Sequence, residues 1–145
     1  MKLKNVFTLL TCMSLLLFSF WIASCSHAYQ PEKIDLAFVS PPSADAVKNP
    51  LKGDQQAVLA GQKLYLKECT PCHGKKGEGD GISSVSLSRV PANHTAAKMK
   101  TLSDGALYWK ISNGFSPMPP YNRTLSETQR WQLVNFLRTL PTASK

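Results

Sequence analysis

Residues 69–73 are Cys-Thr-Pro-Cys-His, and this stretch decides how the rest of the chain must fold. Two cysteines that are separated by two residues and followed at once by a histidine form the attachment signature of a c-type haem. One short turn brings two thiols to the two vinyl groups of the porphyrin, and the next imidazole then reaches the iron. The motif predicts one covalent haem c, with thioethers at Cys69 and Cys72 and with His73 as an iron ligand.

A bare Cys-x-x-Cys pair also occurs in thioredoxin-like redox sites and as half of a zinc site. The other cysteines, Cys12 and Cys25, lie in the N-terminal leader, so a zinc site in the domain would lack thiolate partners. An export signal, a downstream methionine and the flanking helices favour the haem interpretation over both alternatives.

The N-terminus has the pattern of an export signal. Two lysines in the first four residues precede an apolar run over 6–23, and the residues at 22–25 are Ile-Ala-Ser-Cys. This ending resembles a bacterial lipoprotein box, in which the cysteine receives a diacylglycerol and becomes the first residue after cleavage. We therefore predict a signal peptide over 1–24 and lipidation of Cys25.

Two alternatives to the lipoprotein remain. Cleavage after the small-x-small pattern Ser26-His27-Ala28 would release a soluble protein that starts at Tyr29, and an uncleaved leader would act as an anchor. All three outcomes place the domain on the periplasmic side of a membrane in the bacterial cell envelope, where haem is attached to this motif in bacteria.

A proline-rich tether is predicted over 25–52, ahead of a single domain over 53–145. Prolines at 31, 41, 42 and 50 prevent a continuous helix and favour an extended path. The apolar residues at 34, 36, 38 and 39 exceed what a spacer needs. They would dock either on a partner subunit or on the protein's own domain, and a partly ordered arm on its own domain is the favoured interpretation.

The chain has 145 residues and a formal net charge of +8. Loss of Lys2 and Lys4 with the leader leaves fifteen basic side chains against nine acidic ones, a net charge of +6. An excess of this size favours acidic protein partners or anionic lipid head groups. Nucleic acid is not expected as a partner, because the chain is predicted to be exported and its lysines form no dense run.

Three helices are predicted in the domain. Asp54 caps the first, in which Gly61 and Tyr65 share a face; a glycine inside a helix costs about 1 kcal/mol relative to alanine, so another element is expected to pack closely there. The second helix starts at Ser103 and ends at Asn113-Gly114. The last has a capping box at Ser126 and Gln129, an apolar stripe, and Pro141 after its end.

The stretch between the first two helices carries few signals. Residues 74–81 are glycine-rich and polar, as in a loop that crosses the haem edge, and the pattern over 82–100 predicts no regular element. His94 is expected on the surface of a polar loop, and Met99, between two lysines, is expected to be exposed.

Met118 is the predicted sixth ligand of the iron. It lies in the proline-stiffened loop Phe115-Ser116-Pro117-Met118-Pro119-Pro120-Tyr121. A thioether is a soft ligand that favours ferrous iron and raises the reduction potential relative to a second histidine. Met99 and His94 are rival ligands, and an open sixth site is the remaining alternative.

The order of helix, haem motif, loop, helix, methionine loop and amphipathic last helix resembles a class I cytochrome c over 53–140. The motifs are Gly61-x-x-Leu64-Tyr65, His73-Gly74, Asn113-Gly114, Met118-Pro119-Pro120 and Trp131-x-x-Val134-Asn135-Phe136-Leu137. The resemblance implies an all-α fold in which the first and last helices cross, with Gly61 against Phe136. It also implies that the sulfur ligand is Met118.

The chain departs from the family where many members have a proline, soon after the motif, whose carbonyl accepts the second N–H of the haem-binding histidine. Ile82 follows the glycine stretch here, so the sequence identifies no acceptor for His73. Tyr108, Trp109 and Arg89 are candidate partners for the haem propionates, or else ordinary core or surface residues.

The function expected from these features is one-electron transfer by a membrane-tethered monohaem cytochrome in a respiratory or related chain. The pattern is also similar to monohaem lipoprotein cytochromes of quinol-oxidising complexes, so the chain would be a carrier or a complex subunit. Lysines near the motif at 63, 67, 75 and 76 are expected to steer an acidic redox partner. The alternative is a haem enzyme or gas sensor with an open sixth site, such as a small peroxidase.

Overall fold

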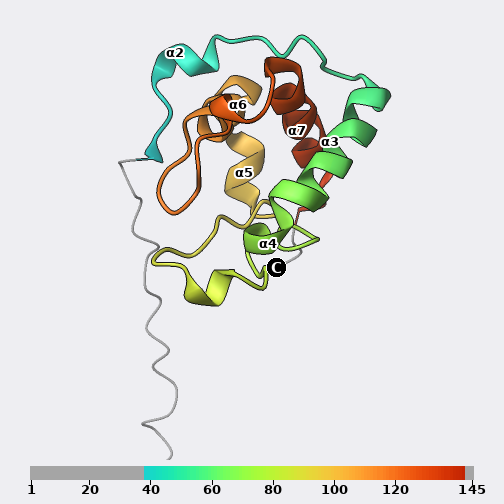
Figure 1. Cartoon of the computed structure of the whole chain (residues 1–145). Helices are drawn as coiled ribbons and strands as arrows, with labels where there is room; N and C mark the ends of the chain where they lie inside the picture. The colour runs from blue at the N-terminus through green and yellow to red at the C-terminus, as the bar shows by residue number, and fades with distance from the viewer. Residues whose placement is uncertain (1–37, 143–145) are drawn as a thin grey trace, which may run out of the picture. The chain divides into compact units, whose positions relative to one another are not determined.

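Helices make up the regular structure of residues 38–142, which are the residues that the computed structural model describes. In chain order they are α2 (Pro42–Asp45), α3 (Gln55–Glu68), α4 (Thr70–His73), η3 (Ser84–Ser86), α5 (Ala97–Thr101), α6 (Asp104–Asn113), η4 (Tyr121–Arg123) and α7 (Glu127–Thr139) (Figure 1). Over this range there is no strand, only one isolated antiparallel bridge between Phe115 and Met118. The predicted all-α fold is confirmed.

None of the helices within residues 38–142 is long and apolar enough to cross a membrane. The predicted signal peptide, the lipidated Cys25 and the first part of the tether lie outside the described residues.

The three predicted helices begin at the capping side chains that the sequence indicated. The carboxylate of Asp54 accepts hydrogen bonds from the N–H groups of Gln56 and Ala57 at the start of α3. The hydroxyl of Ser103 accepts from Ala106 N–H at the start of α6. Ser126 and Gln129 form the capping box of α7. Each pairing satisfies N–H groups that a helix N-terminus leaves without a partner.

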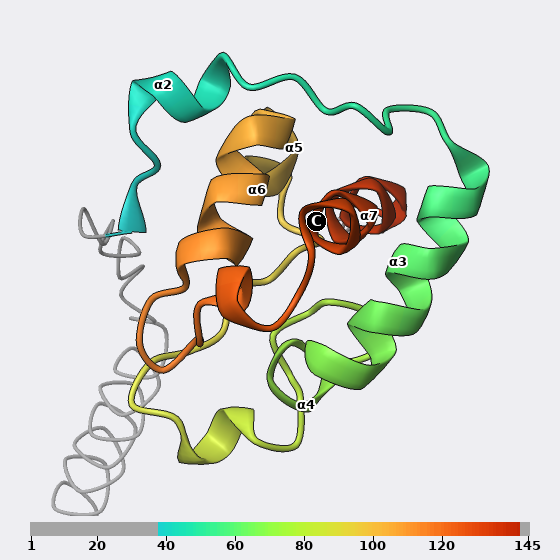
Figure 2. The ribbon, with the colours of Figure 1, turned by 45° about the horizontal axis from the view of Figure 1, so that its top comes forward.

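The crossing of α3 over α7 is the central packing contact of the fold. Figure 2 shows α7 from near its end, with α3 on one side and α6 on the other. A Cβ atom at Gly61 of α3 would lie 1.9 Å from the carbonyl oxygen of Gln132 and 3.0 Å from Cβ of Phe136. Only a glycine permits this approach, which explains why the helix tolerates the propensity cost. The predicted contact between Gly61 and Phe136 is present.

The core forms where α3, α6 and α7 meet. Tyr65, Trp131, Leu133 and Val134 are its largest fully buried side chains. Tyr108 of α6 stacks on Trp131, with ring centroids 4.0 Å apart and an interplanar angle of 15°. Apolar burial of this kind is the main favourable contribution to folding.

A polar network crosses the core beside α7. Asn49 donates to Asp104 Oδ2 at 3.0 Å and to Asn135 Oδ1 at 2.7 Å, while the amide of Asn135, itself buried, donates to the carbonyl of Leu51. Arg138 donates to Asp104 Oδ1 at 2.7 Å. Burial opposes ionisation of Asp104, but the hydrogen bonds from Asn49 and Arg138 hold its pKa below the usual value.

The second part of the predicted tether, residues 38–52, is an arm that lies on the domain. A Cβ atom at Gly105 would lie 1.9 Å from the carbonyl oxygen of Ala44, so α2 approaches α6 closely. Ser103 also donates a hydrogen bond of 2.5 Å to Asp45. In Figure 2 this arm runs over α6 toward α3. Of the four apolar positions in the predicted tether, Phe38 packs on the domain and Val39 is 56% exposed, while positions 34 and 36 lie outside the described residues.

Candidate functional site

The haem motif forms a single tight turn at the end of α3. The N–H groups of Cys72 and His73 both donate to the carbonyl of Cys69, at 3.2 and 2.8 Å, and Gly74 N–H donates to Thr70 at 2.9 Å. Neither Cys69 nor Cys72 forms a disulfide within the described residues. The turn therefore presents two thiols and one imidazole from five consecutive residues, as the spacing predicted.

The glycine-rich loop hydrogen-bonds the carbonyl groups of this turn. Gly79 N–H donates to His73 at 2.9 Å, Gly81 N–H to Cys72 at 3.1 Å, and Ser83 N–H to Pro71 at 2.8 Å. A helix of four residues leaves its last carbonyls without intrahelical partners, and the loop supplies these partners from the main chain. The loop thus holds the turn in one conformation.

His73 is oriented by a residue that the sequence did not identify. Its Nδ1 atom lies 2.9 Å from the carbonyl oxygen of Ala92 and donates to it. Burial lowers the pKa of His73, so the ring is neutral near pH 7. With its proton on Nδ1, the imidazole keeps the lone pair of Nε2 for a metal. The acceptor follows Pro91, and the polar character of the stretch gave no sign of it.

Cys69 is the C-cap residue of α3 and is partly buried against the core. Burial raises the pKa of its thiol to about 12, so it is protonated at neutral pH. Tyr121 donates a hydrogen bond of 3.0 Å to the carbonyl of Glu68, next to Cys69. Burial likewise raises the pKa of Tyr121 to about 12, so its hydroxyl keeps its proton. This bond ties the end of the methionine loop to the haem turn.

The expectation that His94 lies on the surface is wrong. Its ring stacks on that of His73 with centroids 4.2 Å apart and an interplanar angle of 18°. It also meets the edge of the Tyr65 ring, and its Nδ1 atom lies 3.4 Å from the hydroxyl of Tyr65. Burial lowers the pKa of His94 to about 3, so the ring is neutral. The polar neighbours of His94 indicated a surface position, but the loop folds back under the motif and brings the ring against His73.

The expectation that Met99 is exposed is also wrong. Met99 lies on α5, which the sequence did not predict, and it is half-buried against the core. The flanking lysine Lys100 donates to the carbonyl of Leu140 at 2.6 Å. The two lysines on either side of Met99 led to the expectation that this segment is exposed to solvent. Lys100 instead bonds α5 to the end of α7.

Met118 is half-buried in a closed loop. Phe115 and Met118 exchange two main-chain hydrogen bonds, of 2.9 and 2.8 Å. The loop thus has an internal pairing in addition to its prolines. The structure does not test Met118 as a ligand, which stays a prediction.

The three propionate candidates have protein partners. Tyr108 lies between Trp131 and the guanidinium of Arg130, which is 4.7 Å from its ring centroid. The ring centroid of Trp109 lies 6.4 Å from that of Phe38, and the guanidinium of Arg89 lies 4.4 Å from the ring centroid of Phe115. Tyr108 thus packs against the core, Trp109 contacts the arm, and Arg89 contacts the methionine loop.

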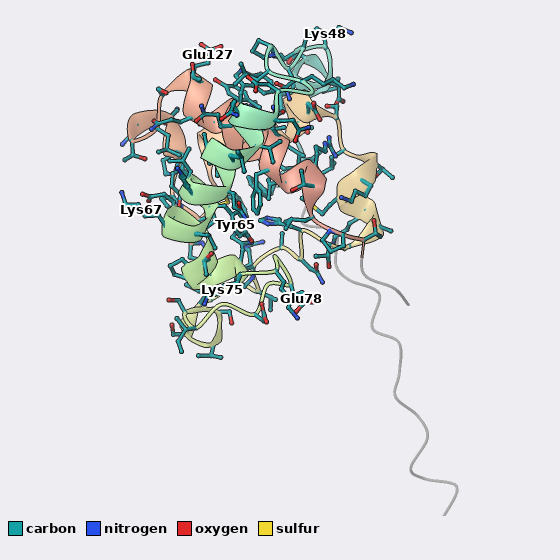
Figure 3. The ribbon with its side chains drawn as sticks, turned by 90° about the vertical axis from the view of Figure 1, so that its right-hand side faces the viewer. Lys48, Tyr65, Lys67, Lys75, Glu78 and Glu127 are labelled. Carbon is teal, nitrogen blue, oxygen red and sulfur yellow. The ribbon has the colours of Figure 1, made fainter. Side chains whose placement is uncertain are left out.

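The four lysines around the motif are exposed, but acidic residues lie among them. Lys67 pairs with Glu68 at 3.1 Å, and a hollow beside α4 is lined by Lys75, Lys76, Glu78 and Asp80 among others. Figure 3 shows Lys67, at the end of α3, and Lys75 and Glu78, on the loop. In contrast, residues 81–103 contain no Asp or Glu and include Arg89, Lys98 and Lys100.

The donor set fits a covalent haem and not a metal ion held by side chains alone. Among the described residues, no three His, Cys, Asp or Glu side chains are grouped so as to hold a metal ion. Two free thiols and a neutral imidazole with an available Nε2 are the groups that a c-type haem requires. The fold and this turn together define a c-type cytochrome domain.

Comparison with known proteins gives the same class. Residues 56–137, more than half of the chain, match the family described as "Cytochrome C oxidase, cbb3-type, subunit III", and the chain belongs to this family. Its cytochrome c domain therefore binds one covalent haem c, the group through which such a domain transfers electrons. No curated protein sequence matches the chain.

Two solved structures are similar. The reducing HAO-like protein complex of Kuenenia stuttgartiensis contains a chain with 31% identity and a TM-score of 0.58, over 66% of this chain and 49% of that one. Cytochrome CL of Methylophaga aminisulfidivorans has 22% identity and a TM-score of 0.51, over 63% and 58%. The second supports the fold alone. This chain spans about half of the length of these structures.

We expect the mature protein to keep the mass of one haem after extraction with acidic acetone, because thioether bonds survive this treatment. The double substitution Cys69→Ala and Cys72→Ala should yield a chain without that mass in intact mass spectrometry. Cys12→Ala, outside the turn, is the matched control and should keep the haem. A wild-type chain that releases its haem into acetone would contradict thioether attachment.

Proposed function

We propose that this domain is a one-electron carrier or electron-transfer subunit whose iron is ligated by His73 and Met118. The observation that carries the proposal is the orientation of His73, whose Nδ1–H is held by the carbonyl of Ala92 so that Nε2 is available to a metal. The haem, once bound, supplies the change of one electron.

Met118 is the proposed second ligand because its loop is closed and is tied to the haem turn. Phe115 and Met118 are paired through the main chain, and Tyr121, three residues after Met118, is bonded to Glu68 at the end of α3. A sulfur held in this way would close the sixth site against oxygen and favour the ferrous state. Met99 is the weaker candidate, since it packs against the core from α5.

Two aromatic side chains pack beside the haem turn, and each keeps one protonation state near pH 7. His94 stacks on His73, and Tyr65, fully buried, donates to the carbonyl of Gly74 at 3.0 Å. Both side chains stay neutral near pH 7, because burial lowers the pKa of His94 and raises that of Tyr65. The two aromatic side chains packed beside the haem turn thus carry no charge near pH 7.

The proposed setting is the periplasmic face of a bacterial membrane, in a respiratory or related electron-transport chain. The residues at 22–25 resemble a lipoprotein box, and lipidation at Cys25 would tether the domain. The family description names an oxidase subunit, and one similar structure is part of a redox complex. These observations favour association with redox proteins, either as a subunit of a complex or as a tethered carrier.

We expect Met118→Ala to change the iron site without removing the haem. The ferric wild-type protein should be low-spin with a weak long-wavelength sulfur-to-iron band, and the variant should be high-spin, bind carbon monoxide when reduced, and have a potential lower by on the order of 0.1 V. Met99→Ala is the matched control and should keep the band. A wild-type protein that is high-spin and binds peroxide would favour the alternative, a haem enzyme or gas sensor with an open site.

Cys25→Ser should move the protein from the membrane fraction to the soluble fraction or leave it unprocessed, because the lipid is attached to the thiol. Cell fractionation and N-terminal sequencing measure this, with Cys12→Ser as the control that stays in the membrane fraction. A native N-terminus at Tyr29 would contradict lipidation.

An acidic redox partner is the proposed docking partner, since the lysines near the motif are exposed and the stretch over 81–103 carries basic residues and no acidic one. Raising the ionic strength from about 10 to about 150 mM should slow bimolecular reduction by such a partner roughly tenfold. Stopped-flow reduction measures the rate, and a neutral small-molecule reductant is the control. Equal rates at both ionic strengths would contradict steering by charge.

A further inference from the structure

The described arm begins against the methionine loop. The Phe38 ring stacks on that of Phe115, with centroids 5.3 Å apart and an interplanar angle of 17°. Trp109 of α6 packs on Phe38 at 6.4 Å with a tilt of 44°. Phe38 thus lies against two aromatic rings, one from α6 and one from the loop that carries Met118.

Lys110 fastens this end of the arm to α6. Its Nζ atom donates to the carbonyl of Phe38 and lies 4.1 Å from the centroid of the Phe38 ring. Burial lowers the pKa of Lys110, although the amine remains a donor to the carbonyl. A cation over an aromatic face adds to the attraction when it is partly removed from water.

Phe115 transmits this contact to the predicted ligand. Its N–H donates to the carbonyl of Met118 at 2.9 Å, and its carbonyl accepts from Met118 N–H at 2.8 Å. A displacement of Phe115 therefore changes the main-chain position of Met118. The Arg89 guanidinium, 4.4 Å from the Phe115 centroid, adds a further contact on the same ring.

We propose that Phe38 is a positioning residue for Met118, so that the N-terminal arm sets how firmly the sulfur closes the sixth site of the iron. This inference rests on the proposed ligation by Met118. Phe38 touches neither the haem turn nor the methionine in the contacts described, and it acts through Phe115.

The position of Phe38 in the chain connects this contact to the predicted lipid anchor. Twelve residues, 26–37, separate Phe38 from Cys25, the predicted lipid site, so the segment between the anchor and the domain ends on the methionine loop. Anything that lifts this segment, such as a partner that binds the arm, would loosen the sulfur ligand and lower the reduction potential. The rest of the arm stays attached through Asn49 and α2, so the domain would remain folded.

Imidazole binding to the ferric full-length holoprotein tests the proposal, because imidazole must displace the sulfur. Phe38→Ala should bind imidazole roughly tenfold more tightly than the wild type, as judged by loss of the long-wavelength sulfur-to-iron band, since the stack and the cation contact that hold the loop are gone. Phe38→Tyr should restore the wild-type affinity. Val39→Ala, in the same arm at a side chain that is 56% exposed, is the matched control and should change nothing.

A second variant covers the case in which Phe38→Ala does not mature. Lys110→Met keeps an unbranched apolar side chain of similar length without the amine, which removes its bond to the arm, and it should also raise the imidazole affinity. Far-UV circular dichroism in denaturant should give Phe38→Ala and Val39→Ala similar unfolding midpoints, since the effect is local.

The outcomes separate this inference from the proposed function. A wild-type protein without the sulfur-to-iron band would overturn both. A wild-type protein with the band, together with equal imidazole affinity in wild type, Phe38→Ala and Lys110→Met, would overturn the positioning role of Phe38 and leave ligation by Met118 in place.

Discussion

A turn of four residues cannot satisfy its own carbonyl groups, and much of the domain follows from this constraint. The carbonyls of Pro71, Cys72 and His73 need donors from elsewhere, and the N–H groups of residues 79, 81 and 83 provide them. The loop that reaches these positions must then return beneath the motif, which brings the carbonyl of Ala92 to His73. The position of His73, the predicted iron ligand, is therefore a result of hydrogen bonds to main-chain groups over about twenty residues.

The parts of the fold that the sequence predicted are those whose signals are local. Asp54, Ser103 and the pair Ser126 and Gln129 mark helix starts because each hydrogen-bonds within its own first turn. Gly61 was informative for the opposite reason, since its helix cost indicated a close neighbour that the structure identifies as Gln132 and Phe136 of α7.

The parts that the sequence did not predict depend on contacts between distant segments. The polar neighbours of His94 indicated solvent, but the loop folds this ring against His73 and Tyr65. Lys100 likewise looked like a surface residue, whereas its amine is bonded to the carbonyl of Leu140, 40 residues later. The residue types in a stretch do not show the path that a loop takes through the fold. The contacts of His94 and Lys100 could therefore be found only in the structure.

The partial burial of Cys69 bears on the order in which haem attachment and folding take place. A thiol reacts through its thiolate, and in the folded domain the pKa of Cys69 is about 12, with Tyr121 bonded to the residue before it. Attachment of the haem at Cys69 is therefore favoured in a chain in which α3 and the segment around Tyr121 have not yet come together.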